Sequence, residues 1–214
     1  MKPEWILERL EAGDVETVKQ KLKEEIYTAS LDKKSGVRQR YAAMKKYFTY
    51  RTGDPDSYLK RPGAVEWHGE KWFSFLNGYS AVLTKESCEG FDFITDGNYP
   101  DVANLMKPEA LRKAKLDMRK MFAEAKAAGY KLKGKEVDGN DFTYLMELGE
   151  AVYKIGLLDA TYSIIDDGEA PTVYYNPTNP KAPIYLENNI GICIVMPVRP
   201  TSWDGKIIIR TEEM

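Results

Sequence analysis

Two short loops of the sequence are rich in acidic residues, whose oxygen atoms could bind a hard cation. The loops hold Asp92, Asp96 and Asp101, and Asp138, Asn140 and Asp141. Magnesium and calcium take carboxylate and amide oxygens as ligands. The same residue types also build turns and helix N-caps, and neither loop has a complete calcium-loop spacing. We expect a structural role, and a divalent-metal enzyme acting through these loops remains an alternative.

Nucleophiles and general bases are scarce. Cys88 and Cys193 are the two cysteines and His68 is the single histidine. Cys193 lies in a strongly apolar run, which is typical of a buried, inert thiol. The sequence has no phosphate-binding loop, no dinucleotide fingerprint and no Gly-x-Ser-x-Gly elbow. These absences disfavour histidine-based, nucleotide-dependent and serine-hydrolase chemistry, and we assign no catalytic residue, no bound metal and no cofactor.

Basic residues are concentrated in two blocks, although the net charge of the chain is only −2. The block from Lys33 to Arg51 has seven basic residues and no acid, and the block from Lys107 to Lys135 has a net charge of +7. The intervening stretches are acidic. Such sorting presents positive charge in chosen places and favours an anionic partner. A solvated helix face is the alternative interpretation of either block.

Periodicity places these blocks on helices. Residues 3–27 predict two helices separated at Gly13, with Asp14 as an N-cap. The other helices are expected from Gly36 to about Phe48, over 108–128 and over 141–155. The expected strands are Ala64–Trp67, Lys71–Leu76, Tyr79–Thr84, Phe91–Thr95, Ala160–Ile165, Thr172–Tyr175, Pro183–Glu187, Gly191–Val198 and Lys206–Thr211. This order predicts an α+β fold of antiparallel sheets with helices, built from two helix-plus-meander units.

Composition is that of a folded protein outside a membrane. Apolar residues make up 43% and charged residues 30% of the 214 residues. The longest apolar run, Ile190–Val198, is far shorter than the ~20 residues of a membrane-spanning helix. The first residues are too acidic for a signal peptide. We expect a cytoplasmic protein with reduced cysteines.

Three short motifs resemble bacterial DNA sliding clamps, the β subunit of the replicative polymerase. Leu76–Val82 is similar to the strand–turn–strand motif of that family. Tyr99-Pro100-Asp101 followed by Leu105-Met106 is similar to the segment that opens its last domain, and Val195–Arg199 is similar to its terminal strand. The motifs occur in the family's order over about 160 residues. Asn77 and Ser80 depart from the family's Asp and Arg, and the chain has room for about half of a three-domain clamp.

The resemblance implies a non-enzymatic protein whose basic helices contact the backbone of duplex DNA without reading its sequence. The DNA-contacting residues would be Arg38, Arg40, Lys45, Lys46, Arg112, Lys113, Lys115, Arg119, Lys120 and Lys126. The resemblance also implies an apolar groove that binds short peptides of polymerases and repair proteins. The groove would use Gly78, Tyr79, Ala81, Pro100, Leu105, Met196, Pro197, Val198 and Arg199.

We divide the chain into a helical extension (1–35), a clamp-like part (36–200, with a boundary near 100–107) and a tail (201–214). Self-association through edge strands is expected, because one chain is too small to surround a duplex. A protein-interaction module from a phage or mobile element, which keeps the fold without encircling DNA, is the second interpretation. The tail could also cover Met196 and Val198, with Ile207–Ile209 acting as a plug.

Overall fold

The structure is a computed structural model that describes residues 2–33, 36–48, 61–86, 88–94, 99–108, 111–129, 144–199 and 207–210. The helices are α1 (Pro3–Glu11), α2 (Val15–Ser30), α3 (Gly36–Phe48), the short 3-10 helix η1 (Ala103–Leu105), α4 (Met118–Ala127) and α5 (Ile155–Tyr162). The strands are β1 (Gly63–Trp67), β2 (Glu70–Leu76), β3 (Ser80–Thr84), β4 (Arg112–Lys115), β5 (Tyr144–Leu148), β6 (Ala151–Lys154), β7 (Thr172–Tyr175), β8 (Ile184–Glu187), β9 (Gly191–Val195) and β10 (Ile207–Arg210). The predicted α+β class is confirmed.

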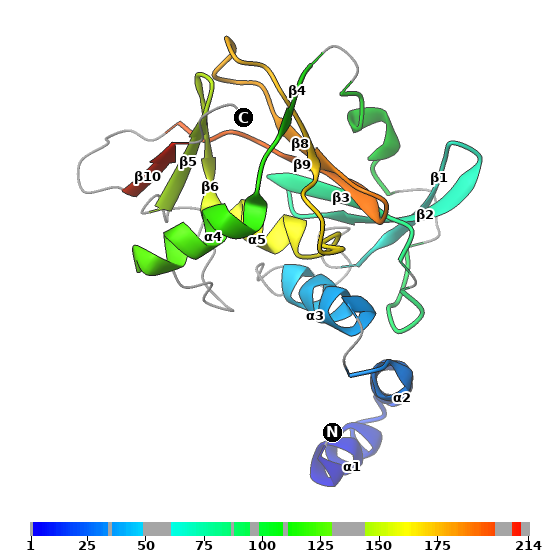
Figure 1. Ribbon diagram of the computed structural model, residues 1–214. Helices are drawn as coiled ribbons and strands as arrows, with labels where there is room; N and C mark the ends of the chain where they lie inside the picture. Colours follow the sequence, from blue (N-terminus) through cyan, green and yellow to red (C-terminus); the bar gives the residue numbers. More distant parts are fainter. Residues whose placement is uncertain are drawn as a thin grey trace.

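A seven-stranded antiparallel sheet forms the centre of the molecule, with the order β1-β2-β3-β9-β8-β7-β4 (Figure 1). Strands β3 and β9 join the two halves of the chain, with Val82 opposite Cys193. A second sheet has the order β10-β5-β6, in which β10 runs parallel to β5. The large sheet therefore depends on pairing between residues more than a hundred positions apart.

One face of the large sheet carries the main core. Phe75, Val82 and Cys193 point to this face and are fully buried against α3, α4 and α5. From α3, Tyr41 and Met44 join the same cluster. Because side chains alternate along a strand, the residues between them point to the opposite face. Helices thus cover one side of the sheet (Figure 1).

The other face of the sheet, which we call the outer face, carries a second apolar cluster. Trp72, Ala81 and Ile194 lie on this face, together with Val102 and Met106 from the connection before β4. The Tyr99 hydroxyl in the same connection donates to the Ser74 carbonyl oxygen on β2, at 3.0 Å. The connection over residues 99–108 therefore covers part of the outer face. This places Pro100 and Leu105 of the predicted groove on the same face as Met196.

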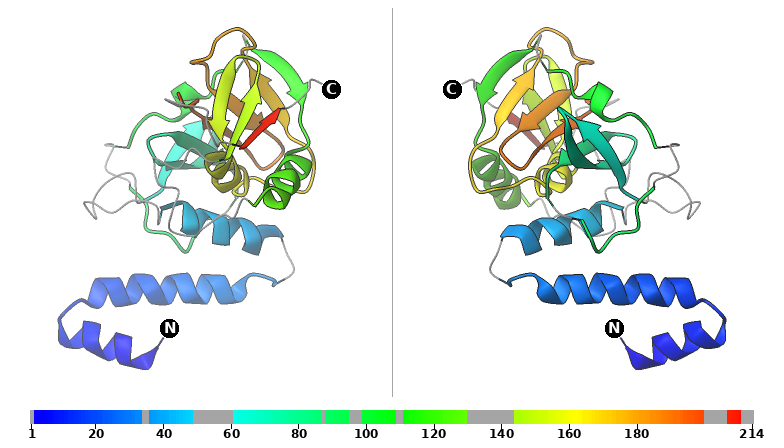
Figure 2. Two further views of the ribbon diagram at one scale, coloured as in Figure 1. Left: turned by 90° about the vertical axis from the view of Figure 1, so that its left-hand side faces the viewer. Right: turned by 90° about the vertical axis from the view of Figure 1, so that its right-hand side faces the viewer.

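Helices α1 and α2 form an arm (residues 2–33) that stands away from the sheets, with α1 farthest out (Figure 2). The predicted break at Gly13 is confirmed by its φ of 76°, and the Asp14 side chain caps α2 by accepting from the Thr17 amide. Helix α2 contacts the body through Tyr27, whose ring packs edge-on against Tyr41 with centroids 4.9 Å apart.

The expected helix over 108–128 is wrong in its first part. Arg112–Lys115 is the edge strand β4, which pairs with β7 so that Arg112 lies opposite Tyr175. Helix α4 begins only at Met118, after the Asp117 side chain caps it by accepting from the Lys120 amide at 2.9 Å. The local sequence suits a helix, but pairing with β7 determines the strand. The basic residues of this block therefore lie on two different elements.

The expected helix over 141–155 is also wrong. Tyr144–Leu148 and Ala151–Lys154 form the β5–β6 hairpin, with Gly149 at a φ of 61° in the turn, and residues 141–143 lie outside the described ranges. The helix is α5, which includes part of the expected strand Ala160–Ile165. Seven of its eight residues are buried. A short helix that is apolar all round cannot be distinguished from a buried strand by periodicity.

Three smaller expectations also change. The strand expected over Phe91–Thr95 is reduced to an isolated bridge between Ile94 and Gly63, and Thr95 lies outside the described residues. The strand expected over Gly191–Val198 ends earlier, at Val195, and it lies in the middle of the sheet. The β10 backbone pairs with β5, whereas Met196 remains 42% exposed. No helix in the described ranges is long and apolar enough to cross a bilayer.

Candidate partner-binding and nucleic-acid surfaces

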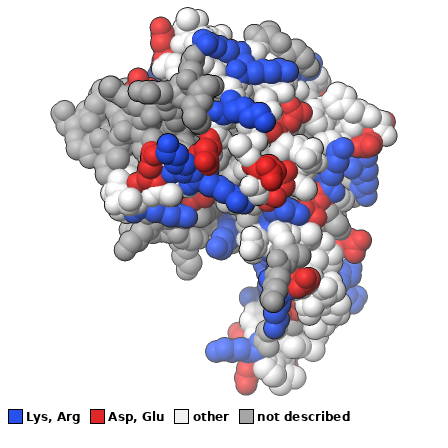
Figure 3. All heavy atoms as spheres, viewed as in Figure 1, with Lys and Arg blue, Asp and Glu red and all other residues white. Residues whose placement is uncertain are grey.

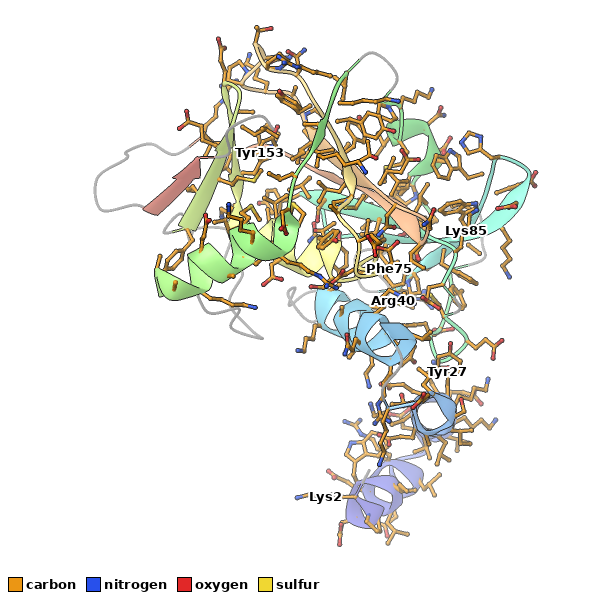
Figure 4. All side chains as sticks on the ribbon, viewed as in Figure 1. Lys2, Tyr27, Arg40, Phe75, Lys85 and Tyr153 are labelled. Atoms are coloured by element: carbon orange, nitrogen blue, oxygen red, sulfur yellow. The ribbon has the colours of Figure 1, made fainter. Side chains whose placement is uncertain are left out.

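Arg40 is the most constrained of the predicted DNA contacts. Its guanidinium is bound to the Glu86 carboxylate through both Nε and Nη2, and Nη1 donates to the Asp166 carbonyl oxygen at 3.2 Å. Arg40 is only 8% exposed, and Figure 4 shows it at the junction of α3 with the sheet. The structure therefore places Arg40 inside the protein, where it holds α3 to two loops, and takes it out of the phosphate-binding set.

The other α3 bases have different environments. Lys45 forms an ion pair with Glu24 of α2, Arg38 is half-buried, and Lys46 is exposed. Burial opposes the charge on Glu24, but hydrogen bonds from Lys21 and Lys45 outweigh it and lower the pKa of this carboxyl. Lys45 thus ties the arm to the body, and Lys46 is the most exposed of the α3 bases.

The second basic block divides between the sheet edge and α4. Arg119, Lys120 and Lys126 are exposed on α4, and Arg119 pairs with Asp166 at 3.2 Å. The β4 bases, which are also exposed, are Arg112, Lys113 and Lys115. The Lys113 ammonium lies 5.3 Å from the centre of the Tyr174 ring. The ten predicted bases do not form one helix face.

Helices α3 and α4 nevertheless lie on the same side of the large sheet, and both contact α5 (Figure 1). A cleft of about 210 Å³ lies where α3 meets α5, lined in part by Lys46, Ala160 and Asp166. In Figure 3, basic and acidic side chains are mixed on the visible face rather than separated into one basic field. The helical side can offer Lys46, Lys120 and Lys126 to an anion.

An apolar surface lies on the outer face of the sheet. Tyr79 and Met196 are 49% and 42% exposed, and the Met196 amide donates to the Tyr79 carbonyl oxygen at 2.9 Å. Leu105, which is 48% exposed, belongs to the covering connection. Its carbonyl accepts from the Tyr185 hydroxyl at 3.1 Å. Tyr185 lies opposite Ile194 on the same sheet, so this bond attaches the connection to the outer face two residues before Met196 in the chain.

The two departures from the clamp motif build the turn that presents Tyr79. The Asn77 side-chain oxygen accepts from the amides of Tyr79 and Ser80, at 3.0 and 2.8 Å, and from the Ser80 hydroxyl. Gly78 has a φ of 83°. Ser80 also lies 2.8 Å from the Tyr47 hydroxyl of α3 and accepts from Thr161 of α5. This network, which sequence reasoning missed, connects the turn to both helices.

The remaining predicted groove residues differ in accessibility. Gly78 and Arg199 are exposed, Pro100 and Pro197 are half-buried, and Ala81 is only 1% exposed beneath them. Val198 is half-buried, and its amide donates to the Val152 carbonyl oxygen at 2.8 Å. We define the outer apolar surface as Tyr79, Leu105 and Met196.

The acidic loops gain no support as a metal site. In the described residues, no group of three or more His, Cys, Asp or Glu side chains is placed to hold a metal ion. Asp92 binds Arg61, and Asp101 caps a turn by accepting from Asn104. Asp96, Asp138, Asn140 and Asp141 lie outside the described residues.

The two cysteines and the histidine have environments that do not suit nucleophilic catalysis. Cys88 and Cys193 are buried, and burial raises the pKa of both thiols. His68 occupies the β1–β2 turn with a φ of 52° and its ring packs on Trp67. These environments make the thiols poor nucleophiles.

Comparison with solved structures identifies the fold. The "Putative DNA polymerase III beta subunit" of Eubacterium rectale matches with a TM-score of 0.51 and 12% identity, over 77% of this chain and 64% of that one. The chain has the fold of a DNA sliding clamp. The C. crescentus beta sliding clamp matches with a TM-score of 0.49 and 15% identity, over 75% of this chain and 63% of that one. For the Bacillus subtilis DNA polymerase sliding clamp the values are 0.48, 11%, 76% and 62%.

The match is structural, and it is partial. No family model matches the sequence, and no curated protein matches it. The chain corresponds to 64% of the length of the Eubacterium rectale protein. It is therefore a divergent example of the sliding-clamp fold, and it spans less than two thirds of the length of the solved clamp structures that it matches.

Proposed function

We propose that this chain is a non-enzymatic, clamp-like protein that recruits partners. It binds short peptides of replication or repair proteins on the outer apolar surface and contacts the backbone of duplex DNA with its helical side. One observation carries the proposal. The motifs alone selected Tyr79, Leu105 and Met196 as groove residues. In the described part of the body, these three are the large hydrophobic residues that are exposed.

The chemistry of this surface suits peptide binding. Met196 has a flexible, polarizable side chain that adapts to varied apolar partners, and Tyr79 offers a ring with a polar edge. The surface rests on a buried floor that includes Ala81 and Ile194. The Asn77–Ser80 turn fixes Tyr79 beside Met196. A rigid floor with adaptable side chains above it can accept apolar side chains of an extended peptide.

The first test is a fluorescence titration with a labelled clamp-binding peptide. We expect saturable binding that weakens about five- to thirtyfold in Met196→Ala, because truncating a central apolar contact removes about 1–2 kcal/mol. Leu7→Ala is the matched control, since it removes a similarly exposed apolar side chain from the arm. Truncation after Pro200 should give no gain in affinity, because Met196 is 42% exposed and the β10 backbone pairs with β5. Negligible binding by the full chain rejects the peptide site.

The DNA contact is supported by the placement of α3 and α4 on one side of the sheet. Neutralising each phosphate adds about −0.9 to the log–log salt slope, so four engaged bases would give a slope near −3.6. We expect Lys120→Glu/Lys126→Glu to abolish low-salt binding to duplex DNA in fluorescence anisotropy. Lys107→Glu/Lys181→Glu makes the same change in net charge away from these helices and should retain it.

An interaction module that binds peptides but not DNA is the second candidate function. The burial of Arg40, the pairing of Lys45 and Arg119, and the mixed charges of Figure 3 favour it. The anisotropy experiment separates the two candidates. Peptide binding without DNA binding at low salt supports the module, whereas salt-dependent DNA binding lost in the α4 variant supports the clamp-like function.

A further inference from the structure

The arm carries most of the exposed apolar side chains of the described chain. Of the eight exposed large hydrophobic residues there, five belong to the arm: Leu7, Leu10, Val15, Leu22 and Ile26. At 100° per residue, Val15, Leu22 and Ile26 fall within a 40° arc of α2. Glu24, which binds Lys45 of the body, lies on the opposite side of the helix. The stripe therefore faces away from the body.

Helix α1 leaves part of this stripe uncovered. At 1.5 Å per residue, α1 spans about 14 Å and α2 about 24 Å. Because the two helices run antiparallel from the Gly13 turn (Figure 2), α1 lies beside only the first half of α2. Ile26 in the second half is 68% exposed. No residue of α1 is buried, and a helix of nine residues is shorter than the ~12–15 that hold together alone in water.

The exposed apolar residues of α1 are flanked by acidic side chains, and those of α2 are flanked by basic side chains. Glu4, Glu8 and Glu11 form one row along α1, next to Leu7. Lys19 and Lys23 form a row along α2 on one flank of the apolar stripe. When an α1 and an α2 pack antiparallel through their exposed apolar residues, the helical geometry puts the acidic row beside the lysine row. One arm thus carries both halves of a complementary surface.

We propose that two copies of this chain associate through their arms about a two-fold axis. In this arrangement α1 of each copy packs antiparallel on the second half of α2 of the other. Leu7 and Leu10 contact Leu22 and Ile26, and the acidic row lies beside Lys19 and Lys23. A second copy is the occupant because it supplies the apolar residues and both charged rows. The existing Lys19–Glu16 pair is exposed and exchanges partners at little cost. The association is independent of the peptide and DNA surfaces.

Sedimentation velocity on the full chain tests the dimer. We expect a dimer whose dissociation constant rises about 100-fold in Ile26→Glu, since each interface then buries a carboxylate among apolar side chains. Met196→Glu is the matched control and should leave the dimer intact. A monomeric wild-type chain in the high micromolar range overturns the proposal. Dissociation by Met196→Glu also overturns it, because the arm would then occupy the outer apolar surface of the partner.

A charge exchange tests the orientation. Glu4→Lys/Glu8→Lys and Lys19→Glu/Lys23→Glu should each be monomeric alone, because like charges meet across both halves of the two-fold interface. An equimolar mixture should restore a dimer, now a heterodimer. If either variant alone remains dimeric, or if mixing restores nothing, the proposed pairing of the two rows is wrong.

Discussion

Helices α1 and α5 have nearly the same length and opposite surroundings. Helix α5 has eight residues, of which seven are buried, and it contacts both sheets as well as α3 and α4. Helix α1 has nine residues, of which none is buried. Both helices carry large apolar side chains, but only those of α5 are buried by neighbouring elements. The difference shows that in a single copy apolar side chains stabilise the body and leave α1 almost unsupported.

The largest expected effect breaks the body through α5. Leu158→Ala should lower the free energy of unfolding by about 2–5 kcal/mol, because Leu158 is fully buried and the substitution leaves a cavity. Leu7→Ala, at concentrations where the chain is monomeric, should change it by less than about 0.5 kcal/mol. Urea denaturation followed by tryptophan fluorescence measures both. Equal losses would contradict the contrast between arm and body.

Ion pairs extend the comparison with an intermediate effect. Arg40→Met leaves Glu86 largely buried without its partner and should cost about 3 kcal/mol. Lys45→Met removes the pair between arm and body, whose lysine is 39% exposed, and should cost no more than about 1 kcal/mol. The same urea denaturation measures both. In a double-mutant cycle, Arg40→Met/Glu86→Met should be less destabilised than Arg40→Met alone, and a double variant that is worse would count against a buried pair.

The smallest effect is a pH dependence confined to the arm. The lowered pKa of Glu24 means that its contacts stabilise docking of α2 fully above the ordinary value of 4.5. This stabilisation is lost as the pH falls from 4.5 through the lowered pKa. Hydrogen exchange, corrected for intrinsic rates, should show earlier loss of protection in α2 than in α5. Glu24→Gln should remove this pH dependence, and an unchanged profile in that variant would assign it to another group.

Local signals allowed the first half of the fold to be predicted. The Asp14 cap and the Asn77-Gly78 turn act within a few residues, and the arm and the β1–β3 meander follow from them. Residues 112–115 and 144–162 depend on partners far along the chain. Helix formers at Arg112–Lys115 become a strand because β7 is beside them, and α5 lacks a polar face because both sheets, α3 and α4 surround it.

The candidate surfaces divide in the same way. Tyr79 and Met196 could be selected because each belongs to a short motif, and both remain exposed in the structure. The composition of α3 does not show that Arg40 is buried in an ion pair while Lys46 is exposed. The partners of Arg40 are Glu86 and Asp166, which lie 46 and 126 residues away, and no local pattern identifies them.

The position of β9 has a consequence for folding. It lies fourth among seven strands, yet residues 191–195 are made after every other strand of that sheet. Until they arrive, β3 and β8 have unpaired edges, and such edges invite association with other chains. Pairing across so long a stretch of chain also slows folding. During synthesis, the unpaired edges of β3 and β8 must avoid pairing with other chains until residues 191–195 have left the ribosome.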